Sequence, residues 1–83
     1  MPTVSIIIPA YNEEAFIGKL LERVLRADTE SAGFSKEIIV VDDGSQDATS
    51  AIVRELPGIQ LFVQTNQGKG GAVQRGIRHS TAD

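Results

Sequence analysis

The sequence predicts an α/β fold in which three strand and helix units form half of a doubly wound parallel sheet, with the strand order 3-2-1. Two observations carry this prediction. Short runs of β-branched residues recur along the 83 residues, and each run is followed by a stretch with apolar residues at helical spacing. Strands that alternate with helices require right-handed crossovers, which make the strands parallel and put helices on the faces of the sheet.

The stretch Glu37 to Thr49, EIIVVDDGSQDAT, organises the rest of the chain. Its apolar run, Ile38 to Val41, has the length and composition of a strand buried on both faces. Asp42 and Asp43 then stand at the carboxyl end of that strand, where open α/β sheets bind their ligands. Two carboxylates there can accept hydrogen bonds from a nucleoside or help to hold a metal ion. The alternative is that they only cap a helix and orient a turn.

A sharp turn and a second helix are expected after this strand. Gly44 lets the backbone turn, and either Ser45 or Asp47 can cap the helix. The inner positions of that helix are expected to be Ala48, Ile52 and Leu56.

The first strand and helix are expected at the N-terminus. Val4 to Ile8 is a short β-branched run, and Pro9 is expected to end it because proline lacks a backbone donor. Asn12 is a suitable N-cap for a helix that ends near Arg26. The apolar residues at helical spacing, which favour core packing, are Phe16, Ile17, Leu20, Leu21, Val24 and Leu25.

The third unit follows Pro57 and Gly58. Ile59, Leu61 and Val63 alternate with Gln60, Phe62 and Gln64, which predicts an edge strand whose second set of residues is on the less buried face. A glycine-rich loop at residues 66–71 then leads into a helix whose inner face is expected to hold Ala72, Val73, Gly76 and Ile77.

The glycine-rich loop matches neither of two well-known phosphate-binding patterns. It lacks the last glycine of Gly-x-Gly-x-x-Gly, and a Walker loop would need a glycine where the chain has Val63. What remains is a loop, Lys69 and a helix N-terminus, which together can meet an anion such as a diphosphate. Alternatively, the glycines only allow close packing of helix and sheet.

Composition and charge narrow the function. The formal charge of -3 and the absence of a basic run argue against nucleic acid as a partner and favour a small molecule. The chain has no cysteine and one histidine, so a thiolate or histidine metal cluster is excluded. With neither a signal peptide nor a membrane-length apolar run, these residues are expected to be soluble and cytoplasmic.

A second segment is expected to reach the same edge of the sheet as Asp42 and Asp43. Tyr11, in the loop after the first strand, can stack on a base or ribose, and Glu13 can accept a sugar hydroxyl. Taken alone, Tyr11 could be an aromatic residue that only covers the helix, and Glu13 could be an acid that only stabilises the first helical turn. The convergence of three segments on one edge, namely this loop, the acidic pair and the glycine-rich loop, favours a nucleotide pocket.

Three motifs carry a family resemblance. VSIIIPAYNEE at Val4 to Glu14, IIVVDDGSQDAT at Ile38 to Thr49 and NQGKGGAVQRGI at Asn66 to Ile77 resemble the opening third of family 2 glycosyltransferases of the GT-A fold. The likeness is closest to polyprenyl-phosphate sugar synthases, which include the dolichol-phosphate mannosyltransferases. It implies a nucleotide-diphosphate sugar donor and, in the complete protein, transfer of the sugar to an acceptor such as a polyprenyl phosphate.

The resemblance also implies roles for single residues. Pro9, Tyr11 and Glu13 would line the base and ribose, Val41 and Asp43 would contact the base, and Lys69 would lie near the phosphates. With their neighbours at the strand ends, the candidate nucleotide-sugar-binding residues are Pro9, Ala10, Tyr11, Glu13, Val41, Asp42, Asp43 and Lys69. No catalytic or metal-binding residue is assigned.

The sequence departs from the family pattern at its end. The metal-binding Asp-x-Asp motif of the family follows the next strand, and the sequence stops at Asp83 before it. Residues 1–83 are therefore expected to be the N-terminal nucleotide-binding part of a longer enzyme that uses Mg²⁺ or Mn²⁺. Alone, this part is expected to be inactive, to hold no metal tightly and to self-associate through an exposed sheet edge. Membrane association of the complete protein is left open.

Two other classes of protein stay as alternatives. A non-catalytic nucleotide-binding or response-regulator-like signalling module would need a further aspartate at the end of the third strand, where the sequence has Gln64, Thr65 and Asn66. A dinucleotide-dependent oxidoreductase would need the glycine fingerprint that is missing.

Overall fold

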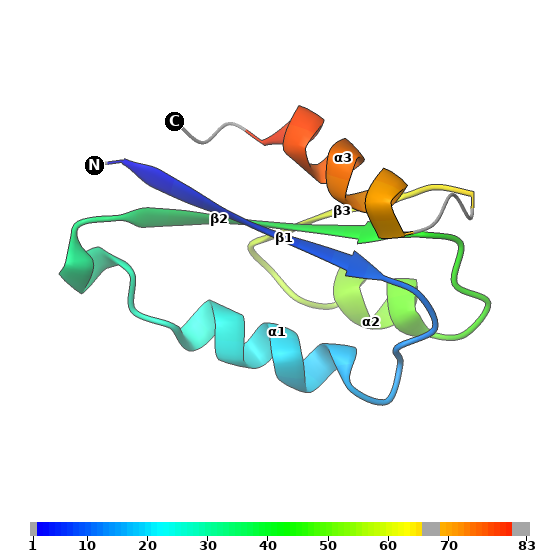
Figure 1. The fold of residues 1–83 in the computed structure, drawn as a ribbon. Coiled ribbons are helices and arrows are strands. Elements are labelled where there is room, and N and C mark those ends of the chain that lie inside the picture. Colours follow the sequence, from blue (N-terminus) through cyan, green and yellow to red (C-terminus); the bar gives the residue numbers. More distant parts are fainter. Residues whose placement is uncertain (1, 66–68, 81–83) are drawn as a thin grey trace.

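The computed structural model describes residues 2–65 and 69–80, apart from the side chains of residues 69 and 70. The elements in chain order are β1 (Thr3–Ala10), α1 (Ile17–Arg26), a short 3-10 helix (Glu30–Ala32), β2 (Ser35–Asp42), α2 (Thr49–Arg54), β3 (Ile59–Val63) and α3 (Lys69–His79). The three strands form one parallel sheet in the order β1-β2-β3. Helices α1 and α2 lie on one face of it and α3 on the other (Figure 1). The predicted fold class and strand order are confirmed.

The central strand β2 is buried on both faces, as its run of β-branched residues predicts. Successive residues of a strand point to opposite faces. Ile38 and Val40 accordingly pack against α1 and α2, in a core layer with Ile17, Leu21 and Val53. On the other face, the buried core residues are Ile39, Val41 and Ala72, with Phe62 packed against them.

The first strand is longer than predicted. It continues through Pro9 to Ala10, which pair in register with Val41 and Asp42 of β2. Pro9 does not end the strand because proline is tolerated in strands at the edge of a sheet. Within the described residues, β1 has a neighbouring strand on one side only.

The start of the first helix was predicted wrongly. Asn12 is not an N-cap: it has φ of 50° and stands in a turn, and α1 begins five residues later at Ile17. The predicted apolar stripe is also only partly buried. Ile17 and Leu21 are in the core, whereas Phe16 is 73% exposed and Leu20 is exposed as well.

The second helix is shorter than predicted. Its N-cap position is held by Ala48, whose side chain makes no capping hydrogen bond, and Leu56 lies beyond the last residue of α2. Neither Ser45 nor Asp47 is at the N-cap position, but Asp47 caps the start of the helix from one residue earlier, because its Oδ1 accepts the N–H of Thr49 over 2.9 Å. The predicted turn at Gly44 is confirmed by its φ of 80°.

Two predictions about which residues face the core were also wrong in the third unit. In β3 the alternation reverses at its end, because Val63 is exposed whereas Gln64 is buried. In α3, Ala72 and Gly76 face inward and Ile77 is 59% exposed. Residues 66–68 of the glycine-rich loop lie outside the described residues.

Candidate active site

The carboxyl ends of the three strands are joined by backbone hydrogen bonds. The N–H of Asp43 donates to the carbonyl of Ala10 over 2.8 Å, and the N–H of Gln64 donates to the carbonyl of Asp42 over 2.9 Å. Both bonds continue the ladders of the sheet by one residue. The acidic pair and the end of β3 therefore form one continuous edge.

Asp42 points to the α2 side of the sheet and is 1% exposed. Its Oδ1 accepts the backbone N–H of Ser45 over 3.0 Å, and its Oδ2 accepts the hydroxyl of Ser50. Both carboxylate oxygens thus have donors within the turn and helix that follow. This geometry matches the alternative in which the first acid orients the turn.

Asp43 has different surroundings. Strand alternation turns it to the α3 side, and it is 4% exposed. Its Oδ1 accepts a hydrogen bond from Nε2 of Gln64 over 2.9 Å, and Gln64 is itself 8% exposed. The two acids therefore stand in separate environments, one tied to a turn and one to a neighbouring strand.

Gln64 is the residue of this edge that the sequence analysis did not select. The sequence signal that could have identified Gln64 is a polar residue at the end of an alternating strand, opposite an acid on the neighbouring strand. Recognising this signal requires the register that pairs Asp42 with Val63, and therefore Asp43 with Gln64, which the structure provides.

The loop after β1 and the turn after β2 are held together by polar contacts around Asn12. The N–H of Asn12 donates to Oγ of Ser45 over 2.7 Å, and Oδ1 of Asn12 accepts the N–H of Gln46 over 2.8 Å. One step further on, the N–H of Glu13 donates to Oγ1 of Thr49 over 2.8 Å. These contacts hold the segment with Tyr11 and Glu13 beside the acidic edge.

Asp47 also links the loop after β1 to the turn after β2. It accepts the N–H of Glu14 over 3.3 Å and both the N–H and the hydroxyl of Thr49. The side-chain hydrogen bond from Thr49, followed by the backbone ones, lowers the pKa of Asp47 from its ordinary value of 3.8. In addition, the side chain of Glu14 accepts the N–H of Ala48 over 3.2 Å.

The remaining predicted site residues differ in accessibility. Tyr11 is exposed, and Pro9 and Glu13 are half-buried. Ala10 and Val41 are buried in the two core layers, so they can offer a ligand little beyond their backbone groups. The side chain of Lys69 lies outside the described residues.

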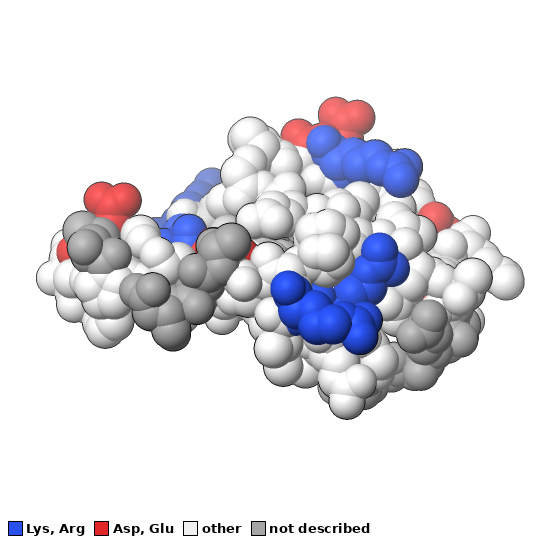
Figure 2. Space-filling model, turned by 90° about the horizontal axis from the view of Figure 1, so that it is seen from above, with Lys and Arg blue, Asp and Glu red and all other residues white. Residues whose placement is uncertain are grey.

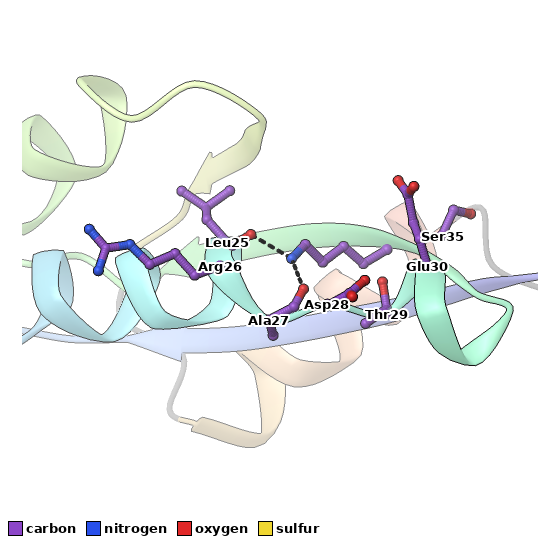
Figure 3. Close-up of a pocket in the computed structure, with 8 residues that line it drawn as sticks. Leu25, Arg26, Ala27, Asp28, Thr29, Glu30 and Ser35 are labelled. Atoms are coloured by element: carbon purple, nitrogen blue, oxygen red, sulfur yellow. Dashed lines mark hydrogen bonds between the residues drawn. The ribbon is translucent and has the colours of Figure 1, made fainter.

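A hollow of about 500 Å³ lies at the opposite end of the sheet (Figure 3). It is lined by Leu25, Arg26, Ala27, Asp28, Thr29, Glu30, Ser35 and Lys36. There Nζ of Lys36 donates to the carbonyls of Val24, Leu25 and Ala27 at 2.9, 2.6 and 2.5 Å. A lysine that satisfies the last carbonyls of a helix is a capping device. The hollow lies at the amino end of β2, away from the acidic edge.

The face covered by α3 carries basic side chains on a mostly uncharged surface (Figure 2). Arg75 of α3 donates to the carbonyl of Val63 over 3.2 Å and lies 5.7 Å from the ring centroid of Phe62. That ring also stacks on His79, with the ring centroids 3.9 Å apart. Phe62 therefore anchors α3 to the end of β3.

In the described part of the chain, no group of three or more His, Cys, Asp and Glu side chains could hold a metal ion. Asp42 and Asp43 do not fit such a site, because they point to opposite faces of the sheet. No helix in residues 2–65 and 69–80 is long and apolar enough to cross a membrane.

These features define a class of protein, an open parallel α/β domain with acidic and polar groups at the carboxyl edge of its sheet. The chain belongs to glycosyltransferase family 2, since residues 5–83 match the family described as Glycosyl transferase family 2. The resemblance found in the three motifs is thereby confirmed.

Several known proteins are similar to the chain. It is 39% identical over 85 residues to a dolichyl-phosphate beta-glucosyltransferase of Dictyostelium discoideum, a match that covers 89% of the chain and 26% of the relative. It is 37% identical over 86 residues to an undecaprenyl-phosphate 4-deoxy-4-formamido-L-arabinose transferase of Edwardsiella ictaluri, covering 96% of the chain and 26% of the relative. The chain therefore spans about a quarter of the length of these relatives.

A solved structure has the same fold. A mannosyltransferase from Pyrobaculum calidifontis, in complex with GDP-Man and Mn²⁺, superposes with a TM-score of 0.78 at 31% sequence identity. The match covers 96% of the chain and 25% of the mannosyltransferase. The predicted GT-A fold, with its half of a doubly wound parallel sheet, is confirmed by this likeness.

Proposed function

We propose that residues 1–83 form the nucleotide-binding part of a glycosyltransferase that transfers a sugar from a nucleotide-diphosphate donor to a polyprenyl phosphate. The observation that carries the proposal is the acidic edge, where Asp43 is held beside Gln64 while Asp42 is used by the turn. Support comes from the relatives, whose names state transfer to dolichyl phosphate and undecaprenyl phosphate, and from the similar mannosyltransferase with its GDP-Man.

In this proposal the acidic edge binds the base and ribose of the donor. Asp43 accepts hydrogen bonds from the base, Tyr11 stacks on the nucleoside, and Glu13 accepts a ribose hydroxyl. Pro9, Ala10 and Val41 shape the floor of the site from the strand ends. Asp42 acts indirectly, by holding the turn at Ser45 and the start of α2.

The diphosphate is proposed to lie toward Lys69 and the N-terminus of α3, where backbone N–H groups favour anions. In the complete enzyme, Mg²⁺ or Mn²⁺ would stabilise the charge of the leaving diphosphate. We propose that the ligands of the metal ion come from outside the described residues, because the side chains of Asp42 and Asp43 point to opposite faces of the sheet. The 83-residue chain is accordingly proposed to bind the donor nucleotide weakly and to transfer no sugar alone.

Calorimetric titration with UDP and GDP tests this assignment. Asp43→Ala is expected to weaken binding at least tenfold, because the base loses its acceptor. Asp42→Ala is expected to lower stability but to leave the affinity of the folded protein within a few-fold of the parent. Mn²⁺ is expected to change the affinity of the 83-residue chain little. A larger loss of affinity in Asp42→Ala, or a large gain with Mn²⁺, would contradict these roles.

We also propose that the 83-residue chain self-associates across β1. Within the described residues this strand has one neighbour, and Val4 at its start is exposed. Unpaired backbone groups along an apolar edge are a template for pairing. Sedimentation over a range of concentrations should show a dimer, and Val4→Lys should shift the equilibrium toward monomer. A parent chain that stays monomeric at high-micromolar concentration would refute the idea.

The complete protein is proposed to act at a membrane surface, because a polyprenyl phosphate is a lipid. Its donor-binding part would then face the cytoplasm, in keeping with a soluble nucleotide sugar. Co-sedimentation of the longer protein with vesicles that contain a polyprenyl phosphate tests this placement, and recovery in the supernatant alone would count against it.

A further inference from the structure

We propose that Gln64 is a positioning residue for the nucleotide base and that it acts by holding the Asp43 carboxylate in one orientation. This inference rests on the proposed function, since it concerns the same edge of the sheet. It adds a residue from the end of the third strand, directly after β3, to a site that the sequence motifs assign to the first two strands and the glycine-rich loop.

The geometry shows a rigid partner for Asp43. The backbone of Gln64 is fixed by its N–H, which donates to the carbonyl of Asp42 over 2.9 Å. Its side chain is buried, and Nε2 donates to Oδ1 of Asp43 over 2.9 Å. A side chain that is anchored at both ends of its length cannot swing away without leaving a buried amide unsatisfied.

The chemistry explains why Asp43 needs such a partner. A buried carboxylate is costly to ionise unless donors compensate for the lost water. A carboxylate can accept about four hydrogen bonds, so the bond from Gln64 is compatible with further donors from a ligand. The amide N–H of Gln64 can only donate, so Asp43 is the accepting partner in this contact.

A carboxylate that accepts hydrogen bonds at this place selects among bases. The edge of uracil presents a ring N–H, and that of guanine presents a ring N–H beside an amino group, so both can donate to Asp43. Cytosine and adenine present a ring nitrogen with a lone pair at the corresponding place, which a carboxylate repels. The pair of Asp43 and Gln64 is therefore suited to uracil or guanine.

A competing interpretation makes the opposite prediction. The side-chain amide of Gln64 has a C=O and an N–H next to each other, as the edge of uracil does. If the amide of Gln64 occupied the place of the base, a nucleotide would have to displace the amide, and substitution of Gln64 would tighten nucleotide binding. The sign of the change in affinity therefore separates a positioning residue from a blocking one.

The experiment is calorimetric titration of the parent chain, Gln64→Met and Gln64→Glu with UDP and GDP, with ADP and CDP as base controls. Gln60→Met is the matched control, because Gln60 is an exposed glutamine of β3, the strand that Gln64 directly follows. Gln64→Met, which keeps the length but loses the donor, is expected to weaken binding of the preferred nucleotide about tenfold. Gln60→Met is expected to bind as the parent does.

The pH profile gives a readout that a merely structural role would not move. In Gln64→Glu two carboxylates lie next to each other, so the pair is expected to take up one shared proton as the pH falls from about 8 to about 5.5. The protonated Glu then donates to Asp43 as the amide did, and affinity should rise toward the parent value, whose own profile stays flat. This recovery also shows that the variant is folded.

The outcomes are distinct. If the parent binds none of the four nucleotides, both this inference and the proposed donor site of the chain are wrong. If the parent binds UDP or GDP and Gln64→Met binds as tightly or more tightly, the positioning role alone is overturned. Equal binding of ADP or CDP by the parent would overturn the base selection.

Discussion

Gly76 determines how closely α3 can approach the sheet. A Cβ atom added to this glycine would lie 2.3 Å from Cγ2 of Ile7 in β1, and 3.3 and 3.4 Å from Cγ1 and Cβ of the same residue. Atoms so near the strand backbone cannot rotate out of the way as the end of a long side chain can. Gly76→Ala should therefore force α3 and β1 apart.

The net effect combines two opposing terms. Overpacking of a core site costs about 1–3 kcal/mol, and the close approach here favours the upper half of that range. Replacing glycine by alanine within a helix returns about 1 kcal/mol. Gly76→Ala is thus expected to lower the free energy of unfolding by about 1–2 kcal/mol.

Gly18 offers a matched control, because it is also a helical glycine. A Cβ atom there would meet Cγ2 of Ile52 at 3.5 Å, which is ordinary contact. Gly18→Ala should therefore stabilise by up to about 1 kcal/mol, so that the urea midpoints of the two variants differ by roughly 2 M. Urea unfolding followed by far-UV circular dichroism measures both. Equal midpoints would refute the close seating of α3, as would a Gly76→Ala/Ile7→Ala double variant in which the two losses simply add.

Two further predictions concern polar contacts. Lys36→Met should destabilise by about 1–2 kcal/mol, because three carbonyls at the end of α1 lose their shared donor; urea unfolding should show no such loss for Lys19→Met, on the exposed side of α1. NMR titration should place the pKa of Asp47 below 3.8, its ordinary value. Because the pKa is depressed in the folded state, the stability that it contributes is present above pH 3.8 and is lost as the pH falls through the folded value. Thr49→Val should raise the pKa of Asp47, and an unchanged pKa would contradict the contact.

The fold could be predicted from the sequence because its main signals are local. The β-branched run at Ile38 to Val41 is buried on both faces as expected, and Gly44 turns where a residue with positive φ is needed. The separation of Asp42 from Asp43 follows from strand alternation alone. These features depend on neighbours in the chain, so a single sequence contains them.

The features that were missed depend on contacts between distant segments. Gln64 meets Asp43 only because β3 pairs with β2 in one register, and no spacing within either strand encodes that register. Ile77 was expected to face inward, but Gly76 allows the helix to approach Ile7 so closely that α3 turns its glycine to the sheet. Tertiary packing thus overrode the helical periodicity.

Asn12 shows a different reason for failure. Asparagine favours helix N-caps, and it also tolerates positive φ more readily than most residues, so its presence does not distinguish a cap from a turn. The structure puts it at φ of 50°, with its side chain accepting the N–H of Gln46 in another loop. It therefore joins two loops of the candidate site instead of starting α1.

Substitution of Asn12 by serine and by glycine separates these two roles, because they rank the variants in opposite order. At an N-cap, serine is equivalent to asparagine and glycine is a few tenths of a kcal/mol worse. At positive φ, the left-handed conformation costs serine about 1–2 kcal/mol, whereas glycine adopts it without steric cost and loses only more chain entropy on folding. Both variants lose the acceptor for Gln46, so that loss cancels in the comparison. Urea unfolding should therefore find Asn12→Ser less stable than Asn12→Gly by about 1 kcal/mol. A serine variant as stable as the parent would instead support Asn12 as an N-cap and contradict its role in a turn with positive φ.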